Sequence, residues 1–346
     1  MNNALLLKAL RREPLERPPV WLMRQAGRYM AEYRAVREGV SFLELCKRPK
    51  LCADVMKTAV ERIGVDAAII FSDLLPILEP LGFELSFLPG DGPKIANPFR
   101  EPGDLARVRE LTDPSPLDFV YETVAETRKA VAPLPVIGFA GAPFTLAGYA
   151  VEGGTSRSFL RTKTFMYNYP DAWRELLGRL ARSAARYLNA QIAAGAHVVQ
   201  IFDSWVGCLG VDDFRRFVLP ALQELRAMLT PGTPAIYFGT GNPALLSSFA
   251  DVGTECVGVD WRIPIADAWD AVGRGRAIQG NLDPTVLLAS PDVVRREATR
   301  ILDAVGAKPG FIFNLGHGIC KETPVENVIT LVETVKAWRA EGSRNE

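Results

Sequence analysis

The chain has 346 residues, of which 48% are hydrophobic and 23% charged, which is typical of a globular protein long enough to bury a large core. Its 40 basic and 40 acidic side chains cancel, so we expect neither nucleic acid nor an anionic membrane surface as a partner. Five cysteines without a CxxC pair, and the lack of both a signal-peptide core and a run of roughly 20 apolar residues, predict a cytoplasmic protein without membrane spans.

Eight short apolar runs predict buried strands that alternate with segments of helical periodicity. The predicted strands cover residues 20–23, 67–71, 135–139, 197–202, 235–238, 256–260, 277–280 and 311–314. The predicted helices cover residues 43–63, 116–131, 170–194, 212–229, 243–251, 264–272, 291–305 and 324–341. Alternation indicates a parallel sheet with helical crossovers, and eight repeats favour a TIM-type (β/α)8 barrel over an open, doubly wound sheet. We therefore expect a single domain over residues 1–346.

The long stretch between the second and third predicted strands breaks this rhythm. Within residues 83–99, alternating apolar residues flank the turn-forming sequence Pro-Gly-Asp-Gly-Pro at 89–93, which predicts an inserted hairpin after the second strand. The sequence fits equally well a hairpin that borders the mouth of the barrel and one that forms a surface loop.

In barrels of this type, function is built on the loops that follow the strands. The first such loop, RQAGR, places Arg24 and Arg28 on either side of Gly27, and Arg34 and Arg37 follow soon after. Guanidinium groups cannot lose their protons, so such a cluster repels itself unless an anion lies within it. We predict that Arg24 and Arg28 bind an anionic substrate, whereas Arg34 is expected to pair with nearby glutamates on a solvated helix.

Asp73 and His317 also follow predicted strands. Asp73 comes after the second strand, where its carboxylate can accept N–H donors or move a proton; the alternative is a cap for the next turn. His317 lies between Gly316 and Gly318, which favours a side chain that projects into a pocket. His197 begins an apolar strand and is interpreted as structural. Two histidines and unclustered cysteines give no indication of a dedicated metal site.

Two hydroxyl groups complete the candidate set. Residues 138–154 contain many small side chains, which allow a bulky flat ligand to lie against the backbone, and Tyr149 offers a hydroxyl there, although packing explains it equally well. Ser204 is interpreted as a ligand-contacting hydroxyl rather than a nucleophile, because neither histidine suggests a Ser-His-Asp arrangement.

The phrases WLMRQAGRYM, DAAIIFSD, GFAGAPFTL with YAVEGG, QGNLDP and NLGHG resemble the uroporphyrinogen decarboxylase family, and the resemblance runs nearly end to end. It implies a single-domain barrel, a homodimer with adjacent clefts, and no cofactor or metal. The implied reaction turns the four acetate side chains of uroporphyrinogen III into methyl groups, giving coproporphyrinogen III and four CO2 in heme biosynthesis.

The resemblance also implies roles for individual residues. By motif position it assigns substrate carboxylates to Arg24, Arg28 and Arg37, pyrrole N–H groups to Asp73, and substrate side chains to Tyr149, Ser204 and His317. We expect Asp73, Arg24 and His317 to contribute to catalysis.

Decarboxylation needs an electron sink, and no predicted strand ends in a lysine that could form a Schiff base. A pyrrole protonated on a ring carbon can act as the sink, with Asp73 stabilising the cation through its N–H. The proton donor stays open among Asp73, a water held by an arginine, and His317.

Two other functions are compatible with this type of barrel or with the anionic site. A corrinoid-linked methyltransferase shares the barrel but holds zinc through a His-x-Cys phrase, which this sequence lacks. A tetrapyrrole carrier without turnover is the alternative from outside the enzymes.

Overall fold

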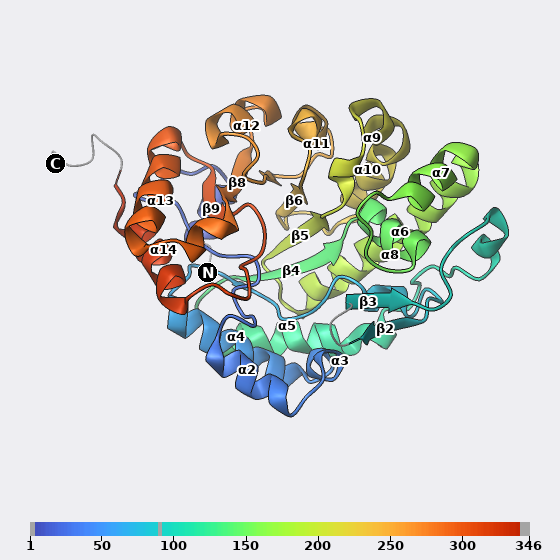
Figure 1. Cartoon of the computed structure of the whole chain (residues 1–346), viewed down its shortest axis with the longest axis horizontal. Helices are drawn as coiled ribbons and strands as arrows, with labels where there is room; N and C mark the ends of the chain where they lie inside the picture. Colours follow the sequence, from blue (N-terminus) through green and yellow to red (C-terminus); the bar gives the residue numbers. More distant parts are fainter. Residues whose placement is uncertain (1–3, 89–91, 340–346) are drawn as a thin grey trace.

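The computed structural model describes residues 4–88 and 92–339. In this part of the chain, seven parallel strands form one curled sheet in the order β1-β4-β5-β6-β7-β8-β9, and Figure 1 shows the helices arranged around its outside. The strands are β1 (Ala68–Ile69), β4 (Val136–Gly141), β5 (Val198–Asp203), β6 (Ala235–Gly239), β7 (Cys256–Gly258), β8 (Ala277–Leu282) and β9 (Phe311–Leu315). Helices cover the sheet, so nearly every strand residue is buried, and this explains the continuous apolar runs in the sequence.

The predicted strand at residues 20–23 is wrong. Only Val20 forms a β-bridge, parallel to Phe313 of β9. Trp21 N donates to Phe313 O (3.3 Å), and on the other side Asp66 N donates to Val20 O (2.8 Å). The chain then turns, with Gln25 N bonded to Leu22 O, so the pairing stops after one residue. This short segment closes the ring between β9 and β1, and the TIM-type architecture is retained.

The predicted helices are confirmed in position, with two interruptions. The observed helices are α3 (Phe42–Cys46), α4 (Pro49–Ile63), α5 (Asp118–Ala130), α8 (Pro170–Ala194), α9 (Val211–Phe217), α10 (Leu219–Met228), α11 (Leu246–Ala250), α12 (Ile265–Val272), α13 (Pro291–Val305) and α14 (Val325–Ala337). The predicted helix 43–63 is broken before Pro49 and the helix 212–229 before Pro220. Proline disfavours a helical conformation in the residue before it, which explains the break at Arg48. Pro220 has no N–H to donate to the carbonyl four residues earlier, and its ring clashes with that carbonyl, so α9 ends at Phe217 and α10 begins at Leu219. The predicted end at 340–341 lies outside the described residues.

Three further helices were not predicted: α1 (Leu5–Leu10), α6 (Pro143–Glu152) and α7 (Leu160–Asn168). The solvated helix that was expected to carry Arg34 is α2 (Ala31–Glu38). Helix α6 occupies most of the small-residue stretch 138–154 and ends at Gly153, which has a left-handed φ of +83°.

A two-stranded antiparallel pair lies outside the barrel sheet. Strand β2 (Leu85–Leu88) pairs with β3 (Gly92–Ile95). Of the predicted turn sequence at 89–93, residues 89–91 lie outside the described residues, and Gly92 and Pro93 belong to β3. Ile95 N donates to Gly153 O (3.0 Å), which joins the pair to the end of α6. Phe87 packs on Phe42, with ring centroids 5.4 Å apart.

The interior of the barrel is filled by side chains. Trp21 Nε1 donates to Gln279 Oε1 (3.0 Å), and Gln279 Nε2 donates to Gln200 Oε1 (3.0 Å), so a chain of hydrogen-bonded side chains crosses the interior of the barrel. The barrel is therefore a packed core, and space for a ligand must come from the loops at its ends. Within the described ranges, no helix is both long and apolar enough to cross a membrane.

Candidate active site

The predicted site residues gather at the carboxyl ends of the strands. Asp73 follows β1, Ser204 follows β5 and His317 follows β9, while Tyr149 lies on α6 after β4. The charge of Arg24 acts on the ionisation of Asp73, Tyr149 and His317, which places these three side chains around one guanidinium group. The structure thus brings four of the predicted residues into one cluster at the mouth of the barrel.

Arg24 is held in an unusual position. Its φ is +62°, a left-handed conformation that non-glycine residues seldom adopt. Its side chain lies against Gly318, where an added Cβ would come within 2.4 Å of Arg24 Cδ. The exposed guanidinium makes no hydrogen bond or ion pair with any residue in the described part of the chain. Arg24 therefore places a guanidinium group without a partner among the described residues at the mouth of the barrel.

Contrary to expectation, Arg34 forms no ion pair with an acidic side chain in the part of the chain that the structure describes. One of its guanidinium nitrogens donates to Arg28 O (2.9 Å) and to Tyr29 O (2.9 Å). The loop turns before α2 and leaves these carbonyls without helical partners, so Arg34 satisfies them. Arg34 is exposed as expected, but its role is to support the loop that carries Arg28.

Arg37 lies further along the same wall. It is half-buried at the end of α2, donates to Val40 O (3.1 Å), and its guanidinium carbon lies 5.7 Å from the centre of the Phe42 ring. Its positive charge acts to lower the pKa of Tyr33 and of Cys46, whereas the charge of Asp73 acts to raise the pKa of Cys46. The charge of Arg28 acts on Tyr33 as well, so Arg37 lies on the same wall as Arg28.

Asp73 uses one oxygen locally. Its Oδ1 accepts from Leu75 N (2.9 Å), so the predicted alternative of a turn cap is also realised. Burial raises the pKa of Asp73, and the Leu75 N–H and then the charge of Arg24 oppose this rise. A carboxylate held in such surroundings is stabilised further by any cationic N–H group that approaches it.

His317 is neutral at physiological pH. Burial, followed by the positive charge of Arg24, lowers its pKa to about 4. The glycines beside it are required for a different reason from the one predicted: a Cβ at position 316 would lie 2.6 Å from Trp261 N, and Gly318 makes room for Arg24. Its ring can therefore donate or accept hydrogen bonds, but imidazolium is scarce.

Tyr149 and Ser204 lie near a buried network that sequence reasoning missed. Asp203 is fully buried, and its oxygens accept from Thr145 Oγ1 (2.7 Å) and from the Tyr237 hydroxyl (2.8 Å). Thr145 Oγ1 also accepts from Trp205 N (3.3 Å). This network fixes the loop after β5 that carries Ser204. Its members are spread over three distant segments, so no local pattern in the sequence revealed it.

The Tyr149 ring packs on Trp205 of that loop, with centroids 5.7 Å apart. Burial, and next the charge of Asp73, raises the pKa of Tyr149 to about 12. Its hydroxyl therefore keeps its proton at neutral pH and can donate a hydrogen bond.

His197 lies away from this cluster. It precedes β5, and its Nδ1 accepts from Val136 N (3.0 Å) at the beginning of β4. The structural interpretation of His197 is confirmed.

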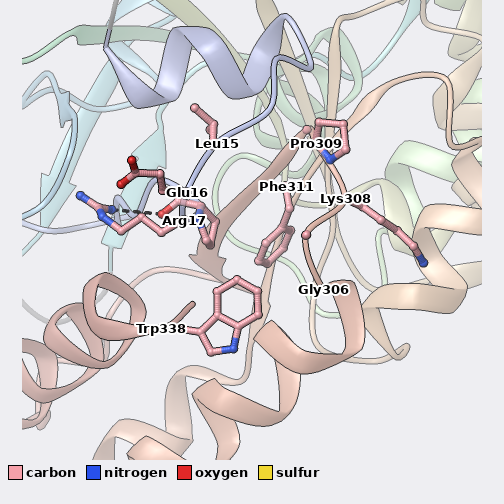
Figure 2. Close-up of a pocket in the computed structure, with 11 residues that line it drawn as sticks. Leu15, Glu16, Arg17, Gly306, Lys308, Pro309, Phe311 and Trp338 are labelled. Carbon is pink, nitrogen blue, oxygen red and sulfur yellow. Dashed lines mark hydrogen bonds between the residues drawn. The ribbon is translucent and has the colours of Figure 1, made fainter. Parts of the chain in front are cut away.

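A small cavity at the other end of the barrel is shown in Figure 2. Its walls include Arg17, Lys308, Trp338 and Phe311, the first residue of β9. The free volume of about 30 Å³ suffices for water but not for a tetrapyrrole. Arg17 is already paired with Asp66 (2.7 Å), so this cavity is not the candidate site.

The sequence matches the family model described as uroporphyrinogen decarboxylase over residues 1–338. The chain is 50% identical over 343 residues to uroporphyrinogen decarboxylase of Koribacter versatilis, which covers 98% of this chain and 97% of that protein. It is 49% identical over 337 residues to the enzyme of the same name from Chloroflexus aurantiacus, covering 96% of this chain and 95% of the relative.

Solved structures share the fold at lower identity. A methyltransferase from Methanosarcina mazei is 24% identical with a TM-score of 0.79, covering 96% of this chain and 98% of its own. A putative vitamin-B12 independent methionine synthase from Listeria monocytogenes is 11% identical with a TM-score of 0.60, covering 93% and 97%. At such identities the likeness concerns the fold alone. Among residues 4–88 and 92–339, no three or more His, Cys, Asp or Glu side chains are grouped to hold a metal ion.

Proposed function

The chain belongs to the uroporphyrinogen decarboxylase family, and on that premise we propose that the cluster around Arg24 converts uroporphyrinogen III to coproporphyrinogen III. The enzyme is a carboxy-lyase: four acetate side chains become methyl groups and four CO2 leave. The observation that carries the assignment to this site is the unshared guanidinium of Arg24 beside Asp73 and His317.

Each decarboxylation follows the same course. A proton adds to a ring carbon of the pyrrole and makes an iminium-like cation. The bond between the acetate CH2 and its carboxyl group then breaks, and the electron pair moves into the ring as CO2 leaves. A second proton adds to the resulting methylene carbon, and loss of the ring proton restores the pyrrole. One proton is consumed for each CO2, and the substrate itself serves as the electron sink.

We assign the stabilisation of that cation to Asp73. Its carboxylate meets the pyrrole N–H, which carries the positive charge in the intermediate. The raised pKa of Asp73 supports this role, because a buried carboxylate gains more from a cationic partner than a solvated one does. The low pKa of His317 leaves Asp73 and an arginine-held water as the proton donors.

The remaining roles concern binding. Arg24, Arg28 and Arg37 bind carboxylates of the substrate. The protonated Tyr149 hydroxyl and the neutral His317 ring form hydrogen bonds with its side chains, as does Ser204. The exposure of Arg24 and Arg28 and the support of the loop by Arg34 favour this arrangement.

We also propose a cytoplasmic homodimer of single-domain subunits. Three large apolar side chains are exposed on or just after α7: Leu160 (69%), Tyr167 (51%) and Tyr169 (45%). Exposed apolar surface of this kind favours a protein partner, and we assign it to a second copy of the chain. Analytical ultracentrifugation tests this, since Tyr167→Ser combined with Leu160→Ser should shift a dimer to monomer.

The reaction is tested by anaerobic incubation with uroporphyrinogen III. Products are oxidised to porphyrins and separated by the number of carboxyl groups that each retains. The proposed enzyme yields the series from eight to four carboxyl groups. Tight binding with recovery of intact substrate would instead identify a carrier.

A further inference from the structure

A second arginine, Arg262, lies at the mouth of the barrel on the loop that follows β7. This loop contains Asp260, Trp261 and Arg262. It packs against the loop after β9, because Gly316 leaves room for Trp261, whose N atom would lie 2.6 Å from a Cβ at that position. Arg262 therefore belongs to the same end of the barrel as Arg24.

Asp260 fixes the position of Arg262. The Asp260 residue is only 5% exposed and accepts from Gly241 N (2.6 Å), Arg262 N (3.0 Å) and the Arg262 guanidinium (2.5 Å). Asn281 Nδ2 donates to Asp260 O (2.9 Å) and Ile263 O (2.8 Å). The loop is thus held from both sides, and a ligand that binds Arg262 orders little that is not already ordered.

The Arg262 guanidinium keeps binding capacity. Its side chain is 44% exposed, and its guanidinium carbon lies 4.3 Å from the centre of the Trp261 ring. One nitrogen contacts Asp260, whereas a guanidinium group carries five N–H donors in a planar fork. Donors remain for a carboxylate that approaches from the mouth.

His317 lies between the two cations. Its neighbour Gly318 contacts Arg24, and its other neighbour Gly316 contacts Trp261, next to Arg262. Both arginines act on the ionisation of His317, and Arg24 also acts on that of Asp73. Arg262 therefore approaches His317 from the loop after β7, whereas Arg24 approaches it from the first loop.

We propose that Arg262 binds a propionate carboxylate of the substrate, opposite the carboxylate bound by Arg24. This inference rests on the proposed function. A reacting acetate must lie near Asp73, so the carboxylate that Arg262 binds beside Trp261 belongs to a group that is not reacting. Acetates are lost one after another, so only a propionate can occupy this position in every decarboxylation. Propionates are retained through all four decarboxylations, and Arg262 thus anchors every intermediate in the same way.

Arg262→Gln tests the assignment. Loss of a charge-assisted contact made equally in the ground and transition states raises KM, by about 10- to 100-fold, and leaves kcat within about two-fold. Because propionates persist, the factor should be the same for substrates with eight, seven, six and five carboxyl groups. Arg262→Lys keeps the charge without the fork and should fall between wild type and Arg262→Gln.

Arg274→Gln is the matched control. Arg274 also pairs with an aspartate, Asp270 (2.5 Å), and also lies over a tryptophan, Trp269 (5.2 Å). It follows the end of α12, however, at the opposite end of the barrel, so its KM should stay at the wild-type value.

The possible outcomes distinguish the proposed decarboxylase function from the proposed contact between Arg262 and a propionate. Wild type that converts no uroporphyrinogen overturns the proposed function. Active wild type with an unchanged KM in Arg262→Gln, or a lowered kcat with unchanged KM, overturns the propionate contact alone. A factor that shrinks as acetates are removed would mean that Arg262 binds an acetate, which also contradicts the proposal. If Arg262→Gln melts early, Arg262→Lys supplies the same comparison.

Discussion

The side chain of Arg24 lies directly against the backbone of Gly318, and a Cβ atom added at position 318 would overlap Arg24 Cδ at 2.4 Å. Through this contact the first and last loops of the barrel form one wall. A second link supports it, because Ile319 N donates to Met23 O (3.0 Å). The position of the Arg24 guanidinium is therefore set by a residue almost three hundred positions away in the sequence.

Gly318→Ala should displace Arg24 without disturbing the backbone, since Gly318 has no left-handed φ. We expect kcat/KM to fall about 10- to 100-fold, because a misplaced binding group is costly even at a displacement near 1 Å. Steady-state kinetics measure the effect. Gly275→Ala, which meets no atom within 4 Å, is the control and should match wild type. Equal kinetics for both variants would show that the contact does not position Arg24.

Asp73→Asn should lower kcat by about 100- to 1,000-fold, the loss typical of a preorganised group that stabilises developing charge. The same change should raise stability at neutral pH. Burial raises the folded pKa of Asp73, so the folded state holds the proton more tightly and ionisation disfavours folding above the unfolded pKa, ordinarily about 3.9. The gain in melting temperature should shrink as the pH falls through about 4, because the carboxyl is neutral in both states below the unfolded pKa. A loss of stability at neutral pH would contradict the assigned environment.

His317 should titrate far below neutral pH. The chain has only two histidines, so NMR of isotopically labelled histidine resolves His317 from His197. Burial and the charge of Arg24 lower the pKa of His317 to about 4, so removing that charge in Arg24→Gln should raise it towards 6.5. Arg274→Gln should leave it unchanged. A wild-type pKa near 6.5 would restore imidazolium as a proton donor.

Tyr237→Phe should destabilise the protein through Asp203. Burial raises the pKa of Asp203 from 3.8 to about 6, so this carboxyl is charged at neutral pH and neutral in the folded state below about pH 6. Removing the hydroxyl takes a charge-assisted partner from a buried carboxylate, which we expect to cost about 2 to 3 kcal/mol at about pH 8 and about 1 kcal/mol at about pH 4.5. Urea unfolding at the two pH values measures the difference. In an Asp203→Asn background the cost should not change with pH; if it does, another group causes the dependence.

The sequence predicts what depends on local pattern. Buried strands such as β4 and β5 show as continuous apolar runs, and helix ends follow prolines and glycines. Residues 20–23 carry the same apolar pattern, yet only Val20 pairs with β9, because the chain turns through Leu22 and Gln25 and leaves the sheet.

The candidate site likewise contains residues that the sequence predicted and residues that it did not. Arg24, Asp73 and His317 were found because each follows a predicted strand, and strand ends share one face of a barrel. The Asp203 network and the anchoring of Arg262 were missed, since their hydrogen bonds join loops that are far apart in the sequence. Arg34 was misassigned for a related reason: its carbonyl partners exist only once the loop has turned.

The most direct test is single-turnover decarboxylation of uroporphyrinogen III by wild type beside Asp73→Asn and Arg24→Gln, with products counted by mass spectrometry. The account predicts that wild type proceeds to the four-carboxyl product. Asp73→Asn should bind substrate with near-native affinity but release almost no CO2, and Arg24→Gln should bind weakly. Near-native CO2 release by Asp73→Asn would contradict the claim that Asp73 stabilises the cation on which the reaction depends.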